Sequence, residues 1–354
     1  MNKILEIGQE RLTLKAHSDS VTAIAFTPDG KTVISGSRDN TIKAWDLKTG
    51  EVKLTFEGHN DWVNAIAVTP DGKTVISGSD DKTIKIWNLE TGEVKFTLTG
   101  HSRWVNAIAI APDGKTLISG SNDRTIKTWD LETGKLKSMF SGHDWVRAIA
   151  ITPDGKTAIS GSNDNTIKTW DLETGKLKSM LSGHSDWVNA IALTLDGKTL
   201  ISGSWDNTIK TWDLGTGEKK LTFKGQGYSF HVTAIAVTPD GKTVISGSSD
   251  NTIKTWDLGT GEKKLTFKGH SGWVNAIAVT PDGRTVISGS SDRTIKIWDL
   301  KTGEETATFT GESLILSCAV ASDGVTIVAG EEASGTLHFL RLQERDSGRI
   351  NVIA

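Results

Sequence analysis

The chain is poor in several residue types, and each shortage excludes a class of protein. Cys318 is the only cysteine among 354 residues, so no intramolecular disulfide can form, and a reducing compartment is expected. No run approaches the roughly eighteen apolar residues that a membrane-spanning helix needs. With 40 basic and 43 acidic residues, the net charge of −3 leaves no basic excess for neutralising phosphates. We therefore expect no membrane insertion and no nucleic-acid partner.

One motif is repeated along almost the whole chain. Thirteen Trp and 37 Gly stand out against a single Tyr and six Pro. An Asp-Gly pair recurs every 41 to 44 residues, with its Asp at positions 29, 71, 113, 154, 196, 240, 282 and 323. A Trp lies sixteen residues after each of the first seven of these Asp residues. Repetition at this period is typical of propellers and solenoids, whose units must stack to bury their apolar faces.

A single unit, residues 52–89, contains four segments that each alternate apolar and polar residues. This alternation predicts β-strands. The stretch Thr-Pro-Asp-Gly-Lys at 69–73 predicts a hairpin, because Pro presets φ for a turn and Gly adopts the left-handed conformation. Bends at 81–83 and 90–93 separate the other strands. Each unit is therefore expected to form a four-stranded antiparallel sheet, and closing the units into a ring would remove exposed sheet edges.

Three short motifs in this unit resemble the WD-repeat family. They are the Gly58-His59 pair, the turn residue Asp81 and the Trp87-Asn88 ending, where most other units have Trp-Asp. The resemblance implies an all-β, closed β-propeller of four-stranded antiparallel blades. It also implies a protein-interaction scaffold, because that is the usual role of the family.

Eight units predict eight blades, although seven is the commoner number in the family. The last unit is divergent, with Leu340-Arg341 in place of Trp-Asp, but it is complete. Its strands are expected at 305–310, 315–320 and 336–342. A seven-bladed ring, the alternative, would leave this unit out.

The two ends of the chain are expected to meet in one sheet. Pairing of the N-terminal strand at 11–15 with the last repeat at 336–342 would close the ring. The propeller then spans residues 10–342 as a single domain. It leaves an N-terminal extension at 1–9 and a C-terminal tail at 343–354.

The WD-repeat resemblance also implies a buried hydrogen-bonded chain in most units. Its members are the His before the inner strand, a Ser on the second strand, the turn Asp and the Trp indole. In the second, third and fifth units they are His59, Ser77, Asp81 and Trp87; His101, Ser119, Asp123 and Trp129; and His184, Ser202, Asp206 and Trp212. In the first, fourth and seventh units they are His17, Ser35, Asp39 and Trp45; His143, Ser160, Asp164 and Trp170; and His270, Ser288, Asp292 and Trp298. The sixth unit has Gln226 in place of the His, and the eighth unit lacks the pattern.

Two repeated patterns mimic catalytic or cofactor motifs. The Asp, His and Ser residues resemble a hydrolase triad, but a triad is used once in a cleft, whereas this set recurs in six units. Gly-Lys-Thr, as at 72–74, mimics the end of a phosphate-binding loop, but Ala67 stands where that loop needs Gly. Histidines on separate blades cannot all approach one zinc ion to about 2 Å. We therefore expect no catalytic residue, no metal and no cofactor.

Positions that vary between near-identical units are candidates for recognition. Because strands alternate in direction, the loop before each inner strand and the bend after each second strand share one face, called here the upper face. The residue before the turn Asp is Arg38, Asp80, Asn122, Asn163, Trp205, Ser249 or Ser291. The residue that opens the inner strand is Ser20, Trp62, Trp104, Trp145, Trp187, His231, Trp273 or Leu314. This second series predicts a ring of Trp around the mouth of the central channel as a binding surface. The alternative is that the indoles pack between blades and stiffen the ring.

Trp205 is the strongest of these candidates for partner binding, because it replaces a small or polar residue on a bend. The one longer loop before an inner strand follows its blade and holds the sole Tyr. We hypothesise that Trp187, Trp205, Tyr228, Phe230 and His231 form an aromatic patch for a partner; local loop packing is the alternative. The further candidates for partner binding are Trp62, Trp104, Trp145, Trp273 and Arg38.

The favoured function is a non-catalytic, monomeric scaffold that presents a rigid face to a protein or peptide. The ending GVTIVAGEEASGTLHFLRL resembles the final repeat of bacterial, especially cyanobacterial, signalling ATPases of the STAND or NB-ARC type. A partner-sensing propeller of such an ATPase is therefore the alternative. A propeller hydrolase is a third alternative, which would need an acid pair or nucleophile confined to one blade. The start, MNKILEIGQERLTL, lacks signal-peptide features, so a cytoplasmic protein is expected. The resemblance to bacterial ATPases implies a bacterial source.

Overall fold

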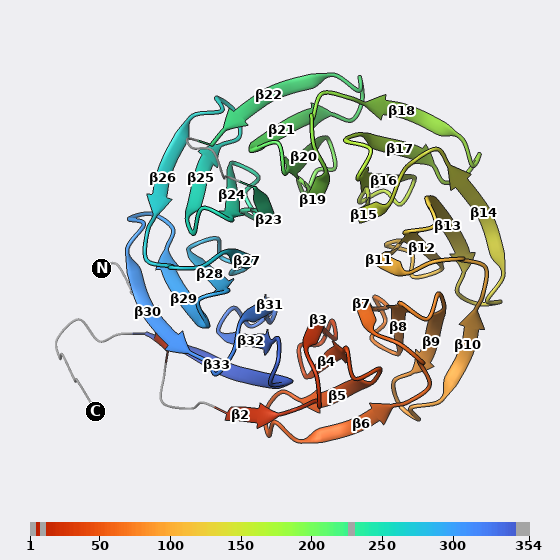
Figure 1. Ribbon diagram of the computed structural model, residues 1–354, viewed down its shortest axis with the longest axis horizontal. Helices are drawn as coiled ribbons and strands as arrows, with labels where there is room; N and C mark the ends of the chain where they lie inside the picture. Colours follow the sequence, from red (N-terminus) through yellow and green to blue (C-terminus); the bar gives the residue numbers. More distant parts are fainter. Residues whose placement is uncertain (1–4, 8–11, 226–230, 345–354) are drawn as a thin grey trace.

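The computed structural model describes residues 5–7, 12–225 and 231–344. Over these residues the chain forms eight antiparallel sheets arranged as blades around a central opening (Figure 1). The eight-bladed prediction is confirmed and the seven-bladed alternative is wrong, because the divergent last unit forms a blade of its own. Among the described residues there is no helix long and apolar enough to cross a membrane.

Seven blades are continuous in sequence, and each runs from an inner strand at the central opening to an outer strand at the rim (Figure 1). Blade 1 consists of β3 (Val21–Phe26), β4 (Thr32–Ser37), β5 (Ile42–Asp46) and β6 (Val52–Phe56). Blade 2 consists of β7 (Val63–Val68), β8 (Thr74–Ser79), β9 (Ile84–Asn88) and β10 (Val94–Leu98). Blade 3 consists of β11 (Val105–Ile110), β12 (Thr116–Ser121), β13 (Thr125–Asp130) and β14 (Leu136–Ser141).

The next four blades repeat this plan. Blade 4 consists of β15 (Val146–Ile151), β16 (Thr157–Ser162), β17 (Ile167–Asp171) and β18 (Leu177–Leu181). Blade 5 consists of β19 (Val188–Leu193), β20 (Thr199–Ser204), β21 (Thr208–Asp213) and β22 (Lys219–Lys224). Blade 6 consists of β23 (Val232–Val237), β24 (Thr243–Ser248), β25 (Ile253–Asp257) and β26 (Lys263–Phe267). Blade 7 consists of β27 (Val274–Val279), β28 (Thr285–Ser290), β29 (Thr294–Asp299) and β30 (Glu305–Thr310).

Blade 8 combines the two ends of the chain. Its strands are β31 (Ile315–Val320), β32 (Thr326–Glu331), β33 (Thr336–Glu344) and β2 (Leu12–Lys15). β2 runs antiparallel to β33, with Leu12 opposite Phe339 and Lys15 opposite Thr336. β1 (Leu5–Ile7) pairs with the far end of β33. The predicted closure is confirmed over β2, while Arg11 lies outside the described residues; the pairing of β2 with β33 joins the two ends of the chain in one blade.

The turns follow from local sequence. In blade 2, Thr69 Oγ1 donates to Asp71 Oδ1 at 2.6 Å, and the same oxygen accepts the Lys73 N–H at 3.0 Å. Gly72 has a φ of +70°, a left-handed conformation that is unfavourable for a residue with a Cβ. These contacts explain why Thr-Pro-Asp-Gly-Lys ends one strand and starts the next.

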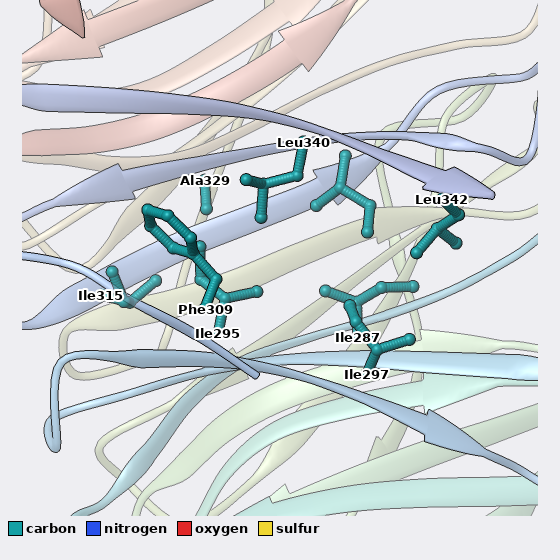
Figure 2. Packing of buried hydrophobic residues seen from close by; sticks show 9 residues of the cluster. Ile287, Ile295, Ile297, Phe309, Ile315, Ala329, Leu340 and Leu342 are labelled. Carbon is teal, nitrogen blue, oxygen red and sulfur yellow. The ribbon is translucent and has the colours of Figure 1, made fainter. Parts of the chain in front are cut away.

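The hydrophobic core lies between neighbouring blades. Figure 2 shows the layer between blades 7 and 8, whose labelled residues are all apolar and buried. The labelled residues are Ile287, Ile295, Ile297, Phe309, Ile315, Ala329, Leu340 and Leu342. Gly289 allows the two blades to approach, because a Cβ there would lie 2.5 Å from Cγ2 of Ile315. Eight such clusters, one at each junction, make the ring a single stiff unit.

Candidate functional site

Six blades contain the buried hydrogen-bonded chain that the WD-repeat resemblance implies. In blade 2, His59 Nδ1 lies 2.7 Å from Asp81 Oδ2 and His59 Nε2 lies 2.7 Å from Ser77 Oγ. Trp87 Nε1 donates to the same Ser77 oxygen at 2.9 Å. The equivalent His–Asp and His–Ser contacts in blades 1, 3, 4, 5 and 7 measure 2.7 to 2.9 Å.

Hydrogen bonds keep the Asp of each of these buried networks ionised. Burial acts to raise the pKa of Asp81, but the hydrogen bonds from His59 and Thr83 outweigh it and hold that pKa well below its usual range. Burial lowers the pKa of His184 and His270, in spite of their Asp partners, because it disfavours the charged imidazolium. In blades 5 and 7, the buried network is therefore a neutral imidazole held between a carboxylate and a hydroxyl.

This Ser–His–Asp arrangement has the contacts of a hydrolase triad but no access for a substrate. Ser77 and Ser202 have no exposed surface, and the hydroxyl oxygen of each also accepts an indole N–H. A nucleophile must reach a reacting carbonyl, which a fully buried oxygen cannot do. The repeated triads are therefore structural.

Blades 6 and 8 have other polar pairs in the same region. In blade 6, Lys254 Nζ lies 2.6 Å from Asp250 Oδ2, and burial lowers the pKa of this Lys. In blade 8, Glu331 Oε1 lies 2.8 Å from His338 Nε2, and both residues are almost fully buried. Burial acts to raise the pKa of Glu331, but hydrogen bonds led by that from His338 lower it to about 2. The sequence signal for this pair is that His338 is the one His outside the first seven units.

The two variable series of the upper face meet in every blade. The backbone N–H of the residue before the bend donates to the carbonyl oxygen of the residue that opens the inner strand, at 2.8 to 3.0 Å. The donor–acceptor pairs are Arg38–Ser20, Asp80–Trp62, Asn122–Trp104, Asn163–Trp145, Trp205–Trp187, Ser249–His231, Ser291–Trp273 and Glu332–Leu314. The variable positions therefore lie side by side on one face.

The tryptophans that open the inner strands occupy two kinds of environment. Trp62, Trp104 and Trp273 are 40%, 49% and 53% exposed. Trp145 and Trp187 are half-buried. The five indoles therefore form an uneven set around the opening, and their role in binding stays a prediction.

Arg38 lies over one of the exposed indoles. Its guanidinium carbon is 4.5 Å from the centre of the Trp62 ring, within the range of a cation–π contact. Its Nη1 is also 3.8 Å from Glu332 Oε1 of blade 8. Arg38 thus has both an aromatic and an acidic neighbour.

Trp205 lies between two rings from different blades. Its ring centre is 4.6 Å from that of Trp187 and 5.1 Å from that of His231, which it stacks at an interplanar angle of 9°. Its Nε1 is buried and has no hydrogen-bond partner among the described residues. Three members of the predicted aromatic patch are therefore in contact, while Tyr228 and Phe230 lie outside the described residues.

Arg147, on β15, extends this row but was not among the predicted site residues. Its guanidinium carbon lies 5.7 Å from the centre of the Trp145 ring and 5.2 Å from that of Trp187. Its Nε donates to Asn163 Oδ1 at 2.8 Å. Burial lowers its pKa, but a guanidinium keeps its proton at neutral pH. The sequence signal was its position on the inner strand, because the other inner strands have a neutral residue there.

The candidate site is therefore a row of five side chains on the upper face of three consecutive blades. We call it the blade 4–6 arc. It consists of Trp145, Arg147, Trp187, Trp205 and His231. In the described part of the chain, no group of three or more His, Cys, Asp or Glu side chains is arranged to hold a metal ion.

Comparison with known proteins agrees with this architecture. Seven segments match the family described as WD domain, G-beta repeat, and each runs from the outer strand of one blade to the third strand of the next. They are residues 8–46, 50–88, 92–130, 134–171, 175–213, 217–257 and 261–299. The chain belongs to the WD40 family. WD40 propellers are generally non-catalytic protein-interaction scaffolds.

Two individual proteins illustrate the breadth of this WD40 likeness. The crystal structure of the computationally designed Ika8 protein is similar with a TM-score of 0.83 and 32% identity, covering 96% of this chain and 100% of that one. The Notchless protein homolog of Arabidopsis thaliana is 38% identical over 47 residues, which are 13% of this chain. Because the match covers 10% of that relative, the chain spans about a tenth of its length.

Proposed function

We propose that this WD40 propeller is a non-catalytic scaffold that binds a protein or peptide partner through the blade 4–6 arc. The observation that carries the proposal is the stack of Trp187, Trp205 and His231 across two blades. Rigid aromatic side chains are enriched at the energetic centres of protein interfaces.

The stiffness of the ring supports the same role. The inner strands β15, β19 and β23 stand next to one another at the central opening (Figure 1), and a packed apolar cluster lies at each of the two junctions between their blades. The arc is therefore held in place before a partner arrives. A preformed surface loses less conformational entropy on binding than a mobile loop does.

The test is a selection of short peptides from a phage-displayed random library against the wild-type chain. The selected peptides are then measured by fluorescence polarisation on wild type and on Trp205→Ser. Serine is the natural residue at this position in blades 6 and 7, so the variant should keep the fold. We expect most selected peptides to lose about tenfold or more in affinity for Trp205→Ser.

The matched control is Asn275→Ala in blade 7, which lies outside the arc. It should leave the affinities unchanged. Peptides that bind Trp205→Ser as tightly as wild type would overturn the assignment of the arc as the binding site.

A second candidate is a partner-sensing propeller of a STAND-type signalling ATPase. It is favoured by the divergent last unit, whose sequence resembles the final repeat of such proteins and whose interior uses the Glu331–His338 pair. The complete reading frame of the gene tests it. A nucleotide-binding domain encoded upstream would support the sensor role, and its absence from the gene would count against it.

A further inference from the structure

We propose that Arg147 binds a side-chain carboxylate, so that the blade 4–6 arc recognises an acidic segment of its partner. This inference rests on the proposed function, that the arc binds a protein or peptide. Arg147 is a cation at the second position of an inner strand. The other seven blades have at this position Thr22, Asn64, Asn106, Asn189, Thr233, Asn275 and Leu316.

Most of the neutral polar residues at this position join neighbouring blades. Asn106 Nδ2 donates to the carbonyl oxygen of Val146 at 2.9 Å, and Asn275 Nδ2 donates to that of Ile315 at 2.9 Å. Among the described residues, Arg147 makes no such bond to blade 5. Its side chain therefore does not form the hydrogen bond between blades that most of its counterparts form.

The charge of Arg147 also lacks a carboxylate partner in the described part of the chain, whereas two other arginines on the upper face have one. Arg38 Nη1 lies 3.8 Å from Glu332, and Arg124 Nε lies 3.1 Å from Asp144. For Arg147, no carboxylate lies within 4 Å in the described part of the chain, and burial alone shifts its pKa. A half-buried cation without a counter-ion has most to gain from an incoming anion.

The geometry around Arg147 suits a carboxylate. Only the Nε–H group is used within the described chain, in the bond to Asn163, so the other four of the five guanidinium N–H groups are available. The rings of Trp145 and Trp187 limit the directions that the guanidinium plane can take. A guanidinium held in this way can form two parallel hydrogen bonds to the two oxygens of a carboxylate.

Two further polar groups lie along the arc. Trp205 Nε1 is buried and has no acceptor in the part of the chain that the structure describes. Asn189, on the inner strand of the same blade, makes no side-chain hydrogen bond among the described residues. An extended peptide that places its carboxylate on Arg147 would bring backbone carbonyl oxygens to this part of the face.

A carboxylate fits the surrounding charge better than a phosphate. Asp144 and Asp186 come directly before Trp145 and Trp187, and Asp186 Oδ1 accepts the backbone N–H of Trp187 at 2.7 Å. These two carboxylates repel a dianion more strongly than a monoanion. Phosphate groups are typically bound by clusters of basic residues, and the arc contains one guanidinium.

The test uses peptides from the selection described above, resynthesised with acetylated and amidated ends so that only side chains carry carboxylates. Each peptide is made as selected, with Asp and Glu replaced by Asn and Gln, and with them replaced by phosphoserine. Affinities are measured by fluorescence polarisation for wild type, Arg147→Asn and the control Asn275→Ala. Asparagine is the natural residue at this position in blades 2, 3, 5 and 7, so Arg147→Asn should keep the fold.

We expect the selected peptides to be enriched in Asp and Glu. The neutral peptides on wild type, and the acidic peptides on Arg147→Asn, should each lose about tenfold in affinity, and the two losses should not add. Two results would overturn the inference: unchanged affinity for Arg147→Asn, or tighter binding of the phosphoserine peptides than of the acidic ones. If those peptides still depend on Trp205, the proposed function stands without this inference; if no peptide depends on Trp205, both fall.

Discussion

Blades 5 and 7 have nearly the same sequence, but their upper faces differ. Their inner strands, β19 and β27, read VNAIAL and VNAIAV. In blade 7, Asn275 Nδ2 donates to Ser291 Oγ at 3.0 Å and to the next blade at 2.9 Å. In blade 5, Trp205 stands in place of the serine, and Asn189 makes neither bond within the described chain.

The interiors of the two blades are nevertheless alike. His184 Nε2 lies 2.8 Å from Ser202 Oγ, and His270 Nε2 lies 2.7 Å from Ser288 Oγ. One exchange on a bend has therefore removed a local acceptor and a link between blades without disturbing the buried network. The interior specifies the fold in both blades, and the bends of the upper face are able to diverge.

The largest expected effect tests whether the interiors of the two blades contribute equally to the free energy of unfolding. Trp212→Ala and Trp298→Ala each remove an indole that is 1% exposed, and each should lower the free energy of unfolding by about 4 kcal/mol. Urea denaturation followed by circular dichroism measures both. Losses that differ by more than about 1.5 kcal/mol would break the comparison. Leu195→Ala, at a side chain that is 72% exposed, is the control.

The next effect concerns the buried histidines. His184→Ala or His270→Ala leaves a buried hydroxyl and a carboxylate short of a partner and should cost about 2 kcal/mol above pH 6.5. Burial lowers the pKa of both histidines from the usual 6.5, so the unfolded chain binds their protons more readily than the folded chain. Their contribution to wild-type stability is therefore complete above pH 6.5 and is lost as the pH falls toward the lowered pKa.

The difference between wild type and either histidine variant should consequently shrink on acidification. Urea midpoints at a series of pH values below 6.5 measure it. A difference that grew in acid would mean that the histidines are protonated in the folded state.

A smaller effect is expected when the residue that distinguishes the two bends, Trp or Ser, is exchanged between blades 5 and 7. Ser291→Trp should remove the acceptor of Asn275 and lower the free energy of unfolding by about 1 kcal/mol. Trp205→Ser should restore an acceptor for Asn189, so its stability should stay within about 1 kcal/mol of wild type. Urea denaturation of both single variants checks this. A cost for Trp205→Ser well above that of Ser291→Trp would mean that the aromatic stack supports the fold of blade 5.

The smallest expected effect is a gain. Arg147→Asn removes a half-buried guanidinium that has no counter-ion within the described chain, and it supplies the side chain that joins blades elsewhere. Stability should therefore rise by about 0.5 kcal/mol. Thermal unfolding compared with wild type measures the change. A clear loss would show that stacking of Arg147 on Trp145 and Trp187 stabilises the ring.

Much of this structure could be predicted from local patterns. Alternation of apolar and polar residues located the strands, and the Thr-Pro-Asp-Gly-Lys turns located the hairpins, because both signals act between residues close in sequence. Comparison between units also singled out Trp205, which differs from its counterparts on other bends. Arg147 was missed, although the same comparison along the inner strands would have shown it as the odd residue.

The Glu331–His338 pair could not be predicted in the same way. The two residues lie on different strands of the divergent blade, and nothing in their spacing shows that both point into the interior. Their contact depends on the register that places Ala329 opposite His338. A buried ionisable pair of this kind becomes visible only when the strands are paired and the neighbouring blade covers them.

The amino-acid sequence by itself determined the repeating unit, its four strands, the eight blades and the closure of the ring, because a sheet with two apolar faces has to stack on a neighbour at each side and the N-terminal strand completes the last sheet. Tertiary structure decided which side chains from different blades meet. Trp187, Trp205 and His231 form one stack, and Arg147 joins it through Trp187, because adjacent blades bring the ends of their inner strands together at the central opening. Contacts of this kind depend on the angle and distance between blades, which arise only when the whole ring is packed.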